Sequence, residues 1–398
     1  MYVEQIYTNC LAEAAYYVES EGEALIIDPI RETKPYIDKA EERGAKIKYV
    51  LETHFHADFV SGHVELASKT KSKIVFGPGA ETSYDVHVAH DGEEFELGKI
   101  KIKVLHTPGH TLESTTYLLI DENGSPYSIF TGDTLFIGDV GRPDLAIKSD
   151  LTEKDLAGML YDSLRQKIMT LPDDVIVYPA HGAGSACGKN MSKETYDTLG
   201  NQKKYNYALQ DISKEDFVTQ LTTGILAAPQ YFAKNAMINK HGYDSLDKIV
   251  EKSLNALSLS EFESLRTEVT LVLDTRSIED FPKAFIPGSV YIGLDGMFAT
   301  WVGTLITDIK QAILLIAPEG REEEAIIRLA RVGYENVIGY LNGGFQTWAS
   351  SGNSIDKVDE VTSDELYEKS ENKDIQINCV TVNCLASHCI CLSSYCLS

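Results

Sequence analysis

The sequence predicts an α/β protein with at least two domains. A chain of 398 residues is longer than one hydrophobic core usually organises. Short apolar runs typical of buried strands, such as residues 24–29 and 271–277, alternate with segments of helical composition. In the last third of the chain this alternation is regular, which predicts a parallel sheet.

The composition favours small-molecule chemistry. Hydrophobic residues make up 43% and charged residues 24%, as in globular proteins, and no run reaches the roughly 18 apolar residues of a membrane span. A net charge of −24 argues against nucleic acid as a partner, because phosphate binding needs a concentrated basic surface. The N-terminus lacks a basic stretch followed by an apolar run, so we expect a cytoplasmic protein with no membrane partner.

The predicted elements follow in chain order. Strand-like runs occupy residues 15–20, 24–29, 47–54, 73–77 and 100–108, and helical composition marks 34–46 and 62–73. Residues 115–133 and 174–182 give further strands that end in polar clusters, and 190–258 reads as a helical connector. The second unit then predicts strands at 271–277, 313–317 and 337–341, with helices at 322–334 and 343–352.

Four polar clusters stand at strand ends, where loops commonly carry chemistry. They are H-x-H-x-D with His54, His56 and Asp58, then P-G-H ending at His110, G-D-T around Asp133, and P-A-H-G with His181. Any single histidine here has a simpler explanation as a surface or hydrogen-bonded core residue, but four clusters in order indicate a metal site. Imidazole suits zinc, iron and copper, and two imidazoles with one carboxylate form the ligand set of non-haem iron(II) oxygenases.

Together the four segments resemble the metallo-β-lactamase superfamily over roughly residues 1–245, which implies an αββα sandwich. In members that hydrolyse, His54, His110 and Asp133 would hold one metal. Asp58, the residue after it and His181 would hold another, with Asp133 bridging. That next residue is Phe59, whose ring cannot bind a metal, so the second site keeps too few ligands and we expect one metal per chain.

A finer resemblance is to the persulfide dioxygenase branch, which includes bacterial fusions with a sulfurtransferase. Segments 53–63, 132–145 and 178–189 carry it. It implies one iron(II), held by His54, His110 and Asp133. The implied reaction oxidises a low-molecular-weight thiol persulfide, of glutathione, coenzyme A or a similar thiol, with O₂ to sulfite and free thiol in sulfide detoxification. Zinc has no redox chemistry and could not replace the iron.

Further residues have expected roles around the metal. His56, Asp58 and His181 would orient ligands or relay protons, which makes Asp58 and His181 catalytic candidates. Cys187 lies in a Gly- and Ser-rich loop, and we expect a thiol that accepts or presents sulfur, with an inert buried cysteine as the alternative. Arg142 and Asp144, in the segment G-R-P-D-L, are counted with Cys187 as substrate-loop residues, and a structural ion pair between them is favoured over binding of substrate carboxylates.

Residues 259–355 resemble a rhodanese-like domain, through the segments 271–293 and 340–352. A working rhodanese carries a cysteine after its central strand, in a loop whose backbone N–H groups cradle an anionic persulfide. Ala317 occupies that position, and Glu319, Glu322 and Glu323 make the loop acidic. We therefore expect no sulfur transfer at this site.

Residues 356–398 predict the start of a further rhodanese-like unit that gives way to an aberrant tail. Residues 361–377 resemble its opening helix and strand, and five of the seven cysteines then fall in the last twenty residues. A frameshifted or prematurely ended tail is favoured over a metal cluster, because the cysteine spacing matches no common ligand pattern.

Three alternatives remain open at this point. They are a glyoxalase II-like thioester hydrolase with two metals, a sulfur-relay or scaffold protein with an idle iron site, and a dioxygenase-sulfurtransferase in which Cys187 passes sulfur to sulfite to give thiosulfate. The expected partners are the thiol persulfide and O₂, a sulfur-carrier protein, and further copies of the chain in a homo-oligomer.

Overall fold

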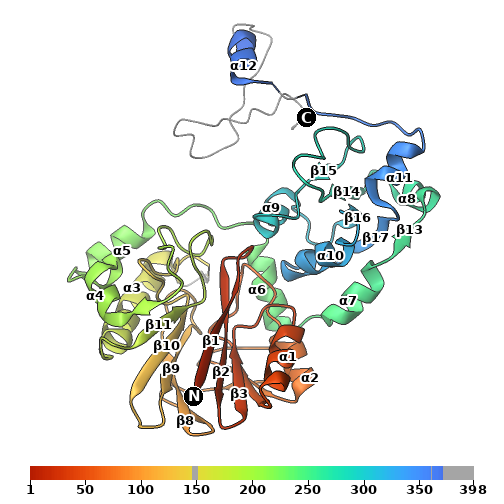
Figure 1. The fold of residues 1–398 in the computed structure, drawn as a ribbon. Coiled ribbons are helices and arrows are strands. Elements are labelled where there is room, and N and C mark those ends of the chain that lie inside the picture. Colours follow the sequence, from red (N-terminus) through yellow and green to blue (C-terminus); the bar gives the residue numbers. More distant parts are fainter. Residues whose placement is uncertain (146–150, 360, 371–398) are drawn as a thin grey trace.

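The computed structural model describes residues 1–145, 151–359 and 361–370, which form a larger and a smaller lobe (Figure 1). The larger lobe contains two six-stranded sheets, and the smaller lobe contains one five-stranded sheet. Among the described residues, no helix has the length and apolar character needed to cross a membrane. The α/β class predicted from the sequence is confirmed.

The first sheet of the larger lobe is mixed. Its strands, in spatial order, are β1 (Tyr2–Thr8), β2 (Glu13–Ser20), β3 (Glu23–Ile27), β4 (Lys46–Leu51), β5 (Lys73–Phe76) and β6 (His87–Val88). The pairs β1–β2 and β2–β3 are antiparallel, and the strands from β3 to β6 are parallel. This parallel half directs the end of β4, and the histidine loop that follows it, toward one edge of the lobe.

The second sheet is antiparallel except for one pair. Its spatial order is β12 (Asp197–Thr198), β11 (Ile176–Pro179), β10 (Pro126–Gly132), β9 (Thr115–Ile120), β8 (Ile100–His106) and β7 (Glu94–Leu97). The parallel pair is β10–β11, with Phe130 opposite Tyr178. Because parallel strands end on the same side, the residues after β10 and β11 are brought together.

Strand alternation explains the layers of the larger lobe. In β2, Tyr16 and Val18 join the core between the two sheets, whereas Tyr17 packs with Tyr36 of α1 on the outer face. The first sheet is covered by α1 (Lys34–Glu42) and α2 (His63–Thr70), and the second by α3 (Glu153–Ser163), α4 (Leu199–Tyr205) and α5 (Lys214–Thr222) (Figure 1). Short π- and 3₁₀-helical turns follow at Leu164–Ile168 and Tyr207–Leu209.

The smaller lobe has an all-parallel sheet, as predicted. Its spatial order is β13 (Ala256–Leu257), β17 (Val337–Leu341), β16 (Ala312–Ile316), β14 (Thr270–Asp274) and β15 (Val290–Tyr291). Around it lie α8 (Leu259–Leu265), α9 (Phe298–Leu305), α10 (Glu322–Arg331) and α11 (Gly344–Ser350). Leu273 and Leu315 are buried on one face and Val272 and Leu314 on the other, as in a sheet with helices on both sides.

Two connecting helices join the lobes, α6 (Phe232–His241) and α7 (Leu246–Ser253). Leu246 and Ile249 of α7 pack against Ala330 of the smaller lobe. The division predicted at residue 245 stays a prediction. Helix α12 (Ser363–Ser370) follows the smaller lobe, and the cysteine-rich tail predicted at 379–398 lies outside the described residues.

Paired charges and one backbone hydrogen bond hold the lobes together. The Arg31 guanidinium, whose side chain is fully buried, lies 2.7 Å from Glu335 Oε1. In a second pair the cation comes from the smaller lobe: Arg331 of α10 binds the carboxylate of Glu32, with Nε donating at 2.8 Å. The backbone N–H of Val60, in the loop after β4, donates to the Arg331 carbonyl at 2.7 Å. The smaller lobe therefore contacts the loop that carries the first histidine cluster.

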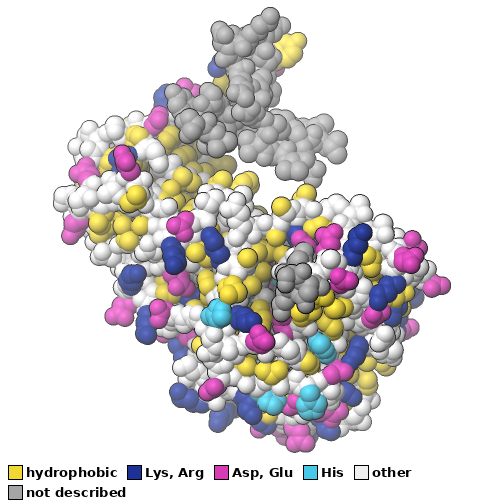
Figure 2. All heavy atoms as spheres, turned by 180° about the vertical axis from the view of Figure 1, so that it is seen from behind, with side chains coloured by type: hydrophobic (Ala, Val, Ile, Leu, Met, Phe, Trp, Pro, Cys, Tyr) yellow, Lys and Arg dark blue, Asp and Glu magenta, His cyan; other side chains and the backbone are white. Residues whose placement is uncertain are grey.

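On the face opposite to Figure 1, lysine and arginine side chains are interspersed with acidic ones across the larger lobe (Figure 2). Apolar side chains gather where the two lobes meet. This face of the larger lobe therefore presents mixed charge rather than a single basic field.

We predict that Arg331→Ala weakens the joint between the lobes. The substitution leaves the largely buried carboxylate of Glu32 without its cation, so the free energy of unfolding should fall by about 3 kcal/mol. Chemical denaturation followed by circular dichroism measures the change. Lys34→Ala is the matched control, because its pair with Asp38 is exposed and should contribute less than about 0.5 kcal/mol. Equal losses in the two variants would contradict the assignment.

Candidate metal centre

The predicted polar clusters meet at one edge of the two-sheet sandwich. His54, His56 and Asp58 follow β4, and His110 lies between β8 and β9. Asp133 and His181 come directly after the parallel strands β10 and β11. All six side chains are buried. The structure therefore brings the four clusters together, as their positions at strand ends predicted.

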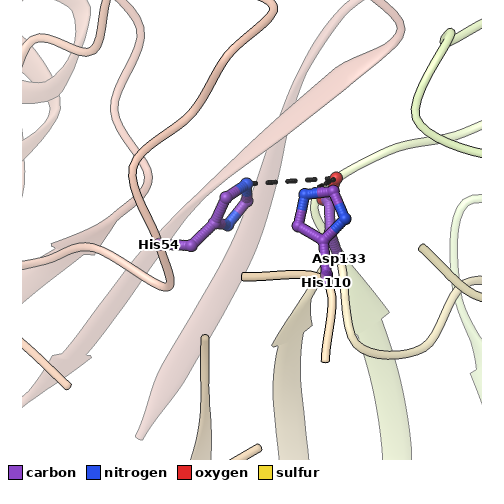
Figure 3. A group of neighbouring side chains, drawn as sticks. All are labelled: His54, His110 and Asp133. Atoms are coloured by element: carbon purple, nitrogen blue, oxygen red, sulfur yellow. Dashed lines mark ion pairs between the residues drawn. The ribbon is translucent and has the colours of Figure 1, made fainter. Parts of the chain in front are cut away.

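The first set of potential ligands is His54, His110 and Asp133 (Figure 3). Their donor atoms lie within 4.8 Å of one another. Asp133 Oδ2 is 3.3 Å from His110 Nε2 and 3.9 Å from His54 Nε2. Two metal bonds of about 2.1 Å at right or tetrahedral angles separate ligand atoms by about 3.0 to 3.4 Å. The Asp133–His110 distance falls in this range, and the Asp133–His54 distance of 3.9 Å is wider.

Two glycines allow the backbone to approach this closely. Gly132 has φ +52°, and a Cβ on it would meet the Thr53 hydroxyl oxygen at 2.5 Å. A Cβ on Gly141 would lie 2.1 Å from the Asp133 carbonyl oxygen and 3.0 Å from His110 Nδ1. A larger residue at position 132 would collide with Thr53, and one at position 141 would displace Asp133 or the His110 ring.

Hydrogen bonds direct Nε2 of each histidine toward the centre. His110 Nδ1 donates to the Arg142 carbonyl at 2.8 Å. His54 Nδ1 lies 3.0 Å from the Thr53 hydroxyl, which itself donates to Asp28 at 2.8 Å and can therefore accept from the ring. Such partners fix the tautomer that leaves Nε2 with a free lone pair. Asp28 has no motif around it, and the sequence alone did not identify it.

The electrostatics of this set fit a cation. Both carboxylate oxygens of Asp133 are buried and have no hydrogen-bond donor among the described residues. A buried, unpaired carboxylate is costly unless a positive charge compensates it. Burial, with the nearby His56, His110 and His181, lowers the pKa of His54 well below its usual range. His54 is thus neutral, as a metal ligand must be.

His56 faces a different group of acids. Its Nε2 lies 3.2 Å from Asp28 Oδ1 and 3.8 Å from Glu52 Oε2. Burial alone would lower the pKa of His56, but Asp28, Glu52 and Asp58 together raise it to about 10. His56 therefore carries a positive charge behind the ligands, although its ring centroid is 4.2 Å from that of His54. Glu52, like Asp28, was not identified from the sequence.

A second set of donor atoms lies beside the first. His181 Nε2 is 3.5 Å from Asp133 Oδ1 and 3.4 Å from Asp58 Oδ2. The Cys187 thiol also lies within 4.8 Å of the donor atoms of Asp133 and His181. Phe59 is fully buried, with its ring 4.4 Å from that of His56. The structure thus adds a thiol to the two ligands that the sequence counted for this position.

Arg142 stabilises the loop around Cys187 through hydrogen bonds. Its guanidinium donates to both carboxylate oxygens of Asp144 and to the carbonyls of Ala186 and Leu226. Its backbone N–H donates to the Cys187 carbonyl at 3.1 Å. These bonds support the structural pair that the sequence favoured, while substrate binding by Arg142 and Asp144 stays a prediction.

A small pocket lies against Asp58. Its wall includes Leu11, Asp58, Ser185, Ala186, Tyr231 and Thr300. Thr300 belongs to α9 of the smaller lobe, and Tyr231 precedes α6. Both lobes therefore line the pocket beside Asp58.

The position in the smaller lobe where a rhodanese has its cysteine, predicted to be inactive here, carries no nucleophile. Ala317 is buried directly after β16, before the loop that leads to α10. Three glutamates occupy the first turn of α10, and the Arg321 guanidinium is paired with Asp295 and Glu324. The loop therefore offers neither a thiol nor an unpaired guanidinium to an anion.

Comparison with known proteins decides the family. Residues 8–181 match the metallo-beta-lactamase superfamily, and residues 258–351 match the rhodanese-like domain. The mitochondrial persulfide dioxygenase ETHE1 of Homo sapiens is 32% identical over 212 residues, which cover 52% of this chain and 74% of the human protein. The chain belongs to the metallo-β-lactamase superfamily. Its αββα sandwich and its rhodanese-like domain are both confirmed.

Other relatives in the superfamily differ in their named activities. A probable hydroxyacylglutathione hydrolase of Schizosaccharomyces pombe is 30% identical, over 46% of this chain and 75% of its own length. A metallo-beta-lactamase structure from Staphylococcus aureus superposes with a TM-score of 0.76 at 32% identity, covering 86% of this chain and 98% of that one. The ETHE1 structure from Myxococcus xanthus gives a TM-score of 0.51 at 28% identity, covering 60% and 98%.

We predict that Asp133→Asn removes the metal from the first set. The amide keeps the size of the side chain but loses the charge that the buried position demands, so metal content should fall at least tenfold. Elemental analysis of the purified protein measures it. Asp173→Asn is the matched control, because Asp173 is exposed and pairs only with Lys203 among the described contacts. Full metal retention in Asp133→Asn would rule out this ligand set.

We further predict that Ala317→Cys alone does not create a sulfurtransferase. The new thiol would sit before the acidic first turn of α10, which repels both thiosulfate and a persulfide anion. Transfer of sulfur from thiosulfate to cyanide should stay at the wild-type level. A clear gain of transfer in this single variant would show that the acidic loop is not the obstacle.

Proposed function

We propose that the chain is a non-haem iron(II) persulfide dioxygenase. The observation that carries the proposal is the first ligand set of two imidazoles and one carboxylate, beside a buried Phe59 where a two-metal pattern has histidine. The similarity to human persulfide dioxygenase supports it. The balanced reaction is R–S–SH + O₂ + H₂O → R–SH + sulfite + 2 H⁺, with a low-molecular-weight thiol as carrier.

The residues present fit one iron(II) held by His54, His110 and Asp133. Iron bound there would supply the redox chemistry that lets dioxygen react with the terminal sulfur, which zinc lacks. The protein would contribute neutral imidazoles, a charged carboxylate and a buried site. Leu11, Tyr231 and Thr300 around the pocket would keep bulk water away from the reacting sulfur.

Asp58 and His181 are the proposed proton-handling pair. Asp58 Oδ2 and His181 Nε2 are 3.4 Å apart, and Asp58 also lines the pocket. His181 Nδ1 donates to the Ala12 carbonyl at 3.2 Å, which holds the ring in place. A proton released by the persulfide, or by the water that completes the reaction, could be held between these two atoms.

The rhodanese-like domain has a proposed shaping role. Thr300 lines the pocket, and Arg331 accepts the backbone hydrogen bond of Val60, six residues after His54. The domain would thus support the histidine loop and close one side of the approach without chemistry of its own. A sulfur-carrier protein and a homo-oligomeric assembly stay predictions.

Each of two alternative activities is favoured by one observation. The similarity to a hydroxyacylglutathione hydrolase favours thioester hydrolysis, which needs no oxygen. The Cys187 thiol beside Asp133 and His181 favours an additional transfer of sulfur to sulfite, giving thiosulfate. Phe59 weighs against the first activity, and the second would add to the oxygenation rather than replace it.

We predict that anaerobically purified, iron-loaded protein consumes one O₂ for each glutathione or coenzyme A persulfide and releases sulfite. An oxygen electrode and sulfite analysis measure both quantities. Zinc-loaded protein should consume no oxygen, because zinc cannot change its oxidation state. Cys10→Ser is the control for thiol chemistry elsewhere in the chain and should retain the activity.

The alternative outcomes are distinguishable. Hydrolysis of a hydroxyacylglutathione by zinc-loaded protein, without oxygen uptake on any persulfide, would replace the dioxygenase by the hydrolase. Thiosulfate as the product in the wild type and sulfite in Cys187→Ala would establish the transferase alternative.

A further inference from the structure

We propose that Asn239 is a positioning residue, which fixes Asp58 by binding the backbone on both sides of it. Asn239 belongs to α6, the connecting helix that runs between the two lobes (Figure 1). Its expected effect on the reaction rate rests on the proposed function, in which Asp58 handles protons. Its expected effect on the conformation of the loop does not depend on that function.

The side-chain amide of Asn239 makes three hydrogen bonds to one loop. Its Nδ2 donates to the carbonyl of His56 at 2.8 Å and to that of Phe59 at 2.9 Å. The backbone N–H of Ser61 donates to its Oδ1 at 2.9 Å. Asp58 directly precedes Phe59 and follows His56 by two positions. The carbonyls on either side of Asp58 are therefore bound to the same nitrogen atom.

The loop between β4 and α2 has little else to fix its backbone near Asp58. Residues 52–62 are all described, and they form no helix and no extended strand. The backbone N–H of Val60 donates to the Arg331 carbonyl, outside the stretch 56–59. Within that stretch, the bonds to Asn239 are the only backbone hydrogen bonds among the described residues. The conformation around Asp58 therefore depends on one amide.

Asparagine suits this position because the loop presents two acceptors and one donor. The two carbonyls must face the amide nitrogen and the N–H must face the amide oxygen, so all three partners select the same orientation of the side chain. The side chain of Asn239 is 1% exposed, so bulk water cannot replace a lost bond. Aspartate would offer no hydrogen to the carbonyls, and leucine would offer no polar atom at all.

The larger lobe holds Asn239 itself in place. The Tyr84 hydroxyl donates to the Asn239 carbonyl at 2.6 Å. The backbone N–H of Ser83 donates to the Lys240 carbonyl at 3.1 Å. The end of α6 is thus fixed against the segment before β6, and the amide is presented to the loop from a rigid element.

The position of Asp58 matters for its partner across the site. Asp58 Oδ2 lies 3.4 Å from His181 Nε2, the pair that the proposed function uses for protons. A displacement of about 1 Å at a reacting group can lower a rate by about 100-fold. The imidazoles of His54 and His110 have hydrogen bonds of their own. Loss of the Asn239 amide should therefore slow the reaction while the metal stays bound.

Asn239→Leu is the diagnostic variant, and Asn235→Leu is its matched control. Asn235 lies one turn earlier in α6 and is equally buried, but its amide atoms have no hydrogen-bond partner among the described residues. With glutathione persulfide, kcat for oxygen uptake per bound iron should fall at least about tenfold in Asn239→Leu. Its iron content should match that of the wild type, and the control should keep the wild-type kcat. Equal kcat in the two variants would contradict the proposal.

A double-mutant cycle tests whether Asn239 acts through Asp58. Asp58→Asn is measured alone and together with Asn239→Leu. Because the proposed role of Asn239 is to place Asp58, the double variant should have the same residual kcat as Asp58→Asn. Losses that multiply in the double variant would assign Asn239 an independent role and overturn the proposal.

Hydrogen exchange of metal-free protein tests the loop without any reaction. Amides of residues 55–62 should be protected in the wild type and in Asn235→Leu, and should exchange at least about tenfold faster in Asn239→Leu. A wild-type loop that gains its protection only when metal binds would overturn the proposal, since the ion and not Asn239 would then order it.

Circular dichroism establishes that each variant is folded. If Asn239→Leu is not, Asn239→Asp replaces it, because the carboxylate keeps the acceptor for Ser61 and loses both donors. Absence of oxygen uptake in the wild type would remove the proposed function, whereas the exchange measurement would still decide the role of Asn239. The two failures are therefore distinguishable.

Discussion

The carboxylate of Asp133 imposes the main physical constraint on this centre. It is buried at the end of β10, and neither of its oxygens has a hydrogen-bond donor among the described residues. One oxygen faces His110 and the other faces His181, so a single side chain joins the two groups of ligands. The glycines at positions 132 and 141 leave the space that this placement needs. The surrounding strands and glycines therefore hold the Asp133 carboxylate between histidine side chains of both ligand groups.

Much of the fold could be predicted from the sequence, because local patterns encode it. The strand-like runs at β2, β14 and β16 predicted strands at the positions where the structure has them. Helix α3 was not predicted, although it begins with a capping box between Thr152 and Asp155. The candidate ligands could be proposed because each stands beside turn residues after a strand, and loops of both sheets meet at one edge of the sandwich.

The remaining features depend on contacts between residues far apart in the chain. Asp28 and Glu52 lie in ordinary strand-end sequence, yet they set the charge of His56. The approach of Cys187 to Asp133 depends on the path of a loop that Arg142 fixes from 45 positions earlier in the chain, by a hydrogen bond to the Cys187 carbonyl. Counting ligands by motif therefore gave Asp58 and His181 for the second position, whereas in the structure the Cys187 thiol also lies near His181 and Asp133.

The hydrogen bond from Val60 to Arg331 couples the docking of the smaller lobe to the conformation of the loop that carries the candidate ligands. Val60 shares its loop with His54 and Asp58, so any free energy that docking contributes to ordering this loop also favours the ion that the loop binds. Thermodynamic reciprocity requires that the ion favour docking by the same amount. A contact between the rhodanese-like domain and the histidine loop is thus enough to couple domain docking to occupancy of the ligand set, without a ligand from that domain.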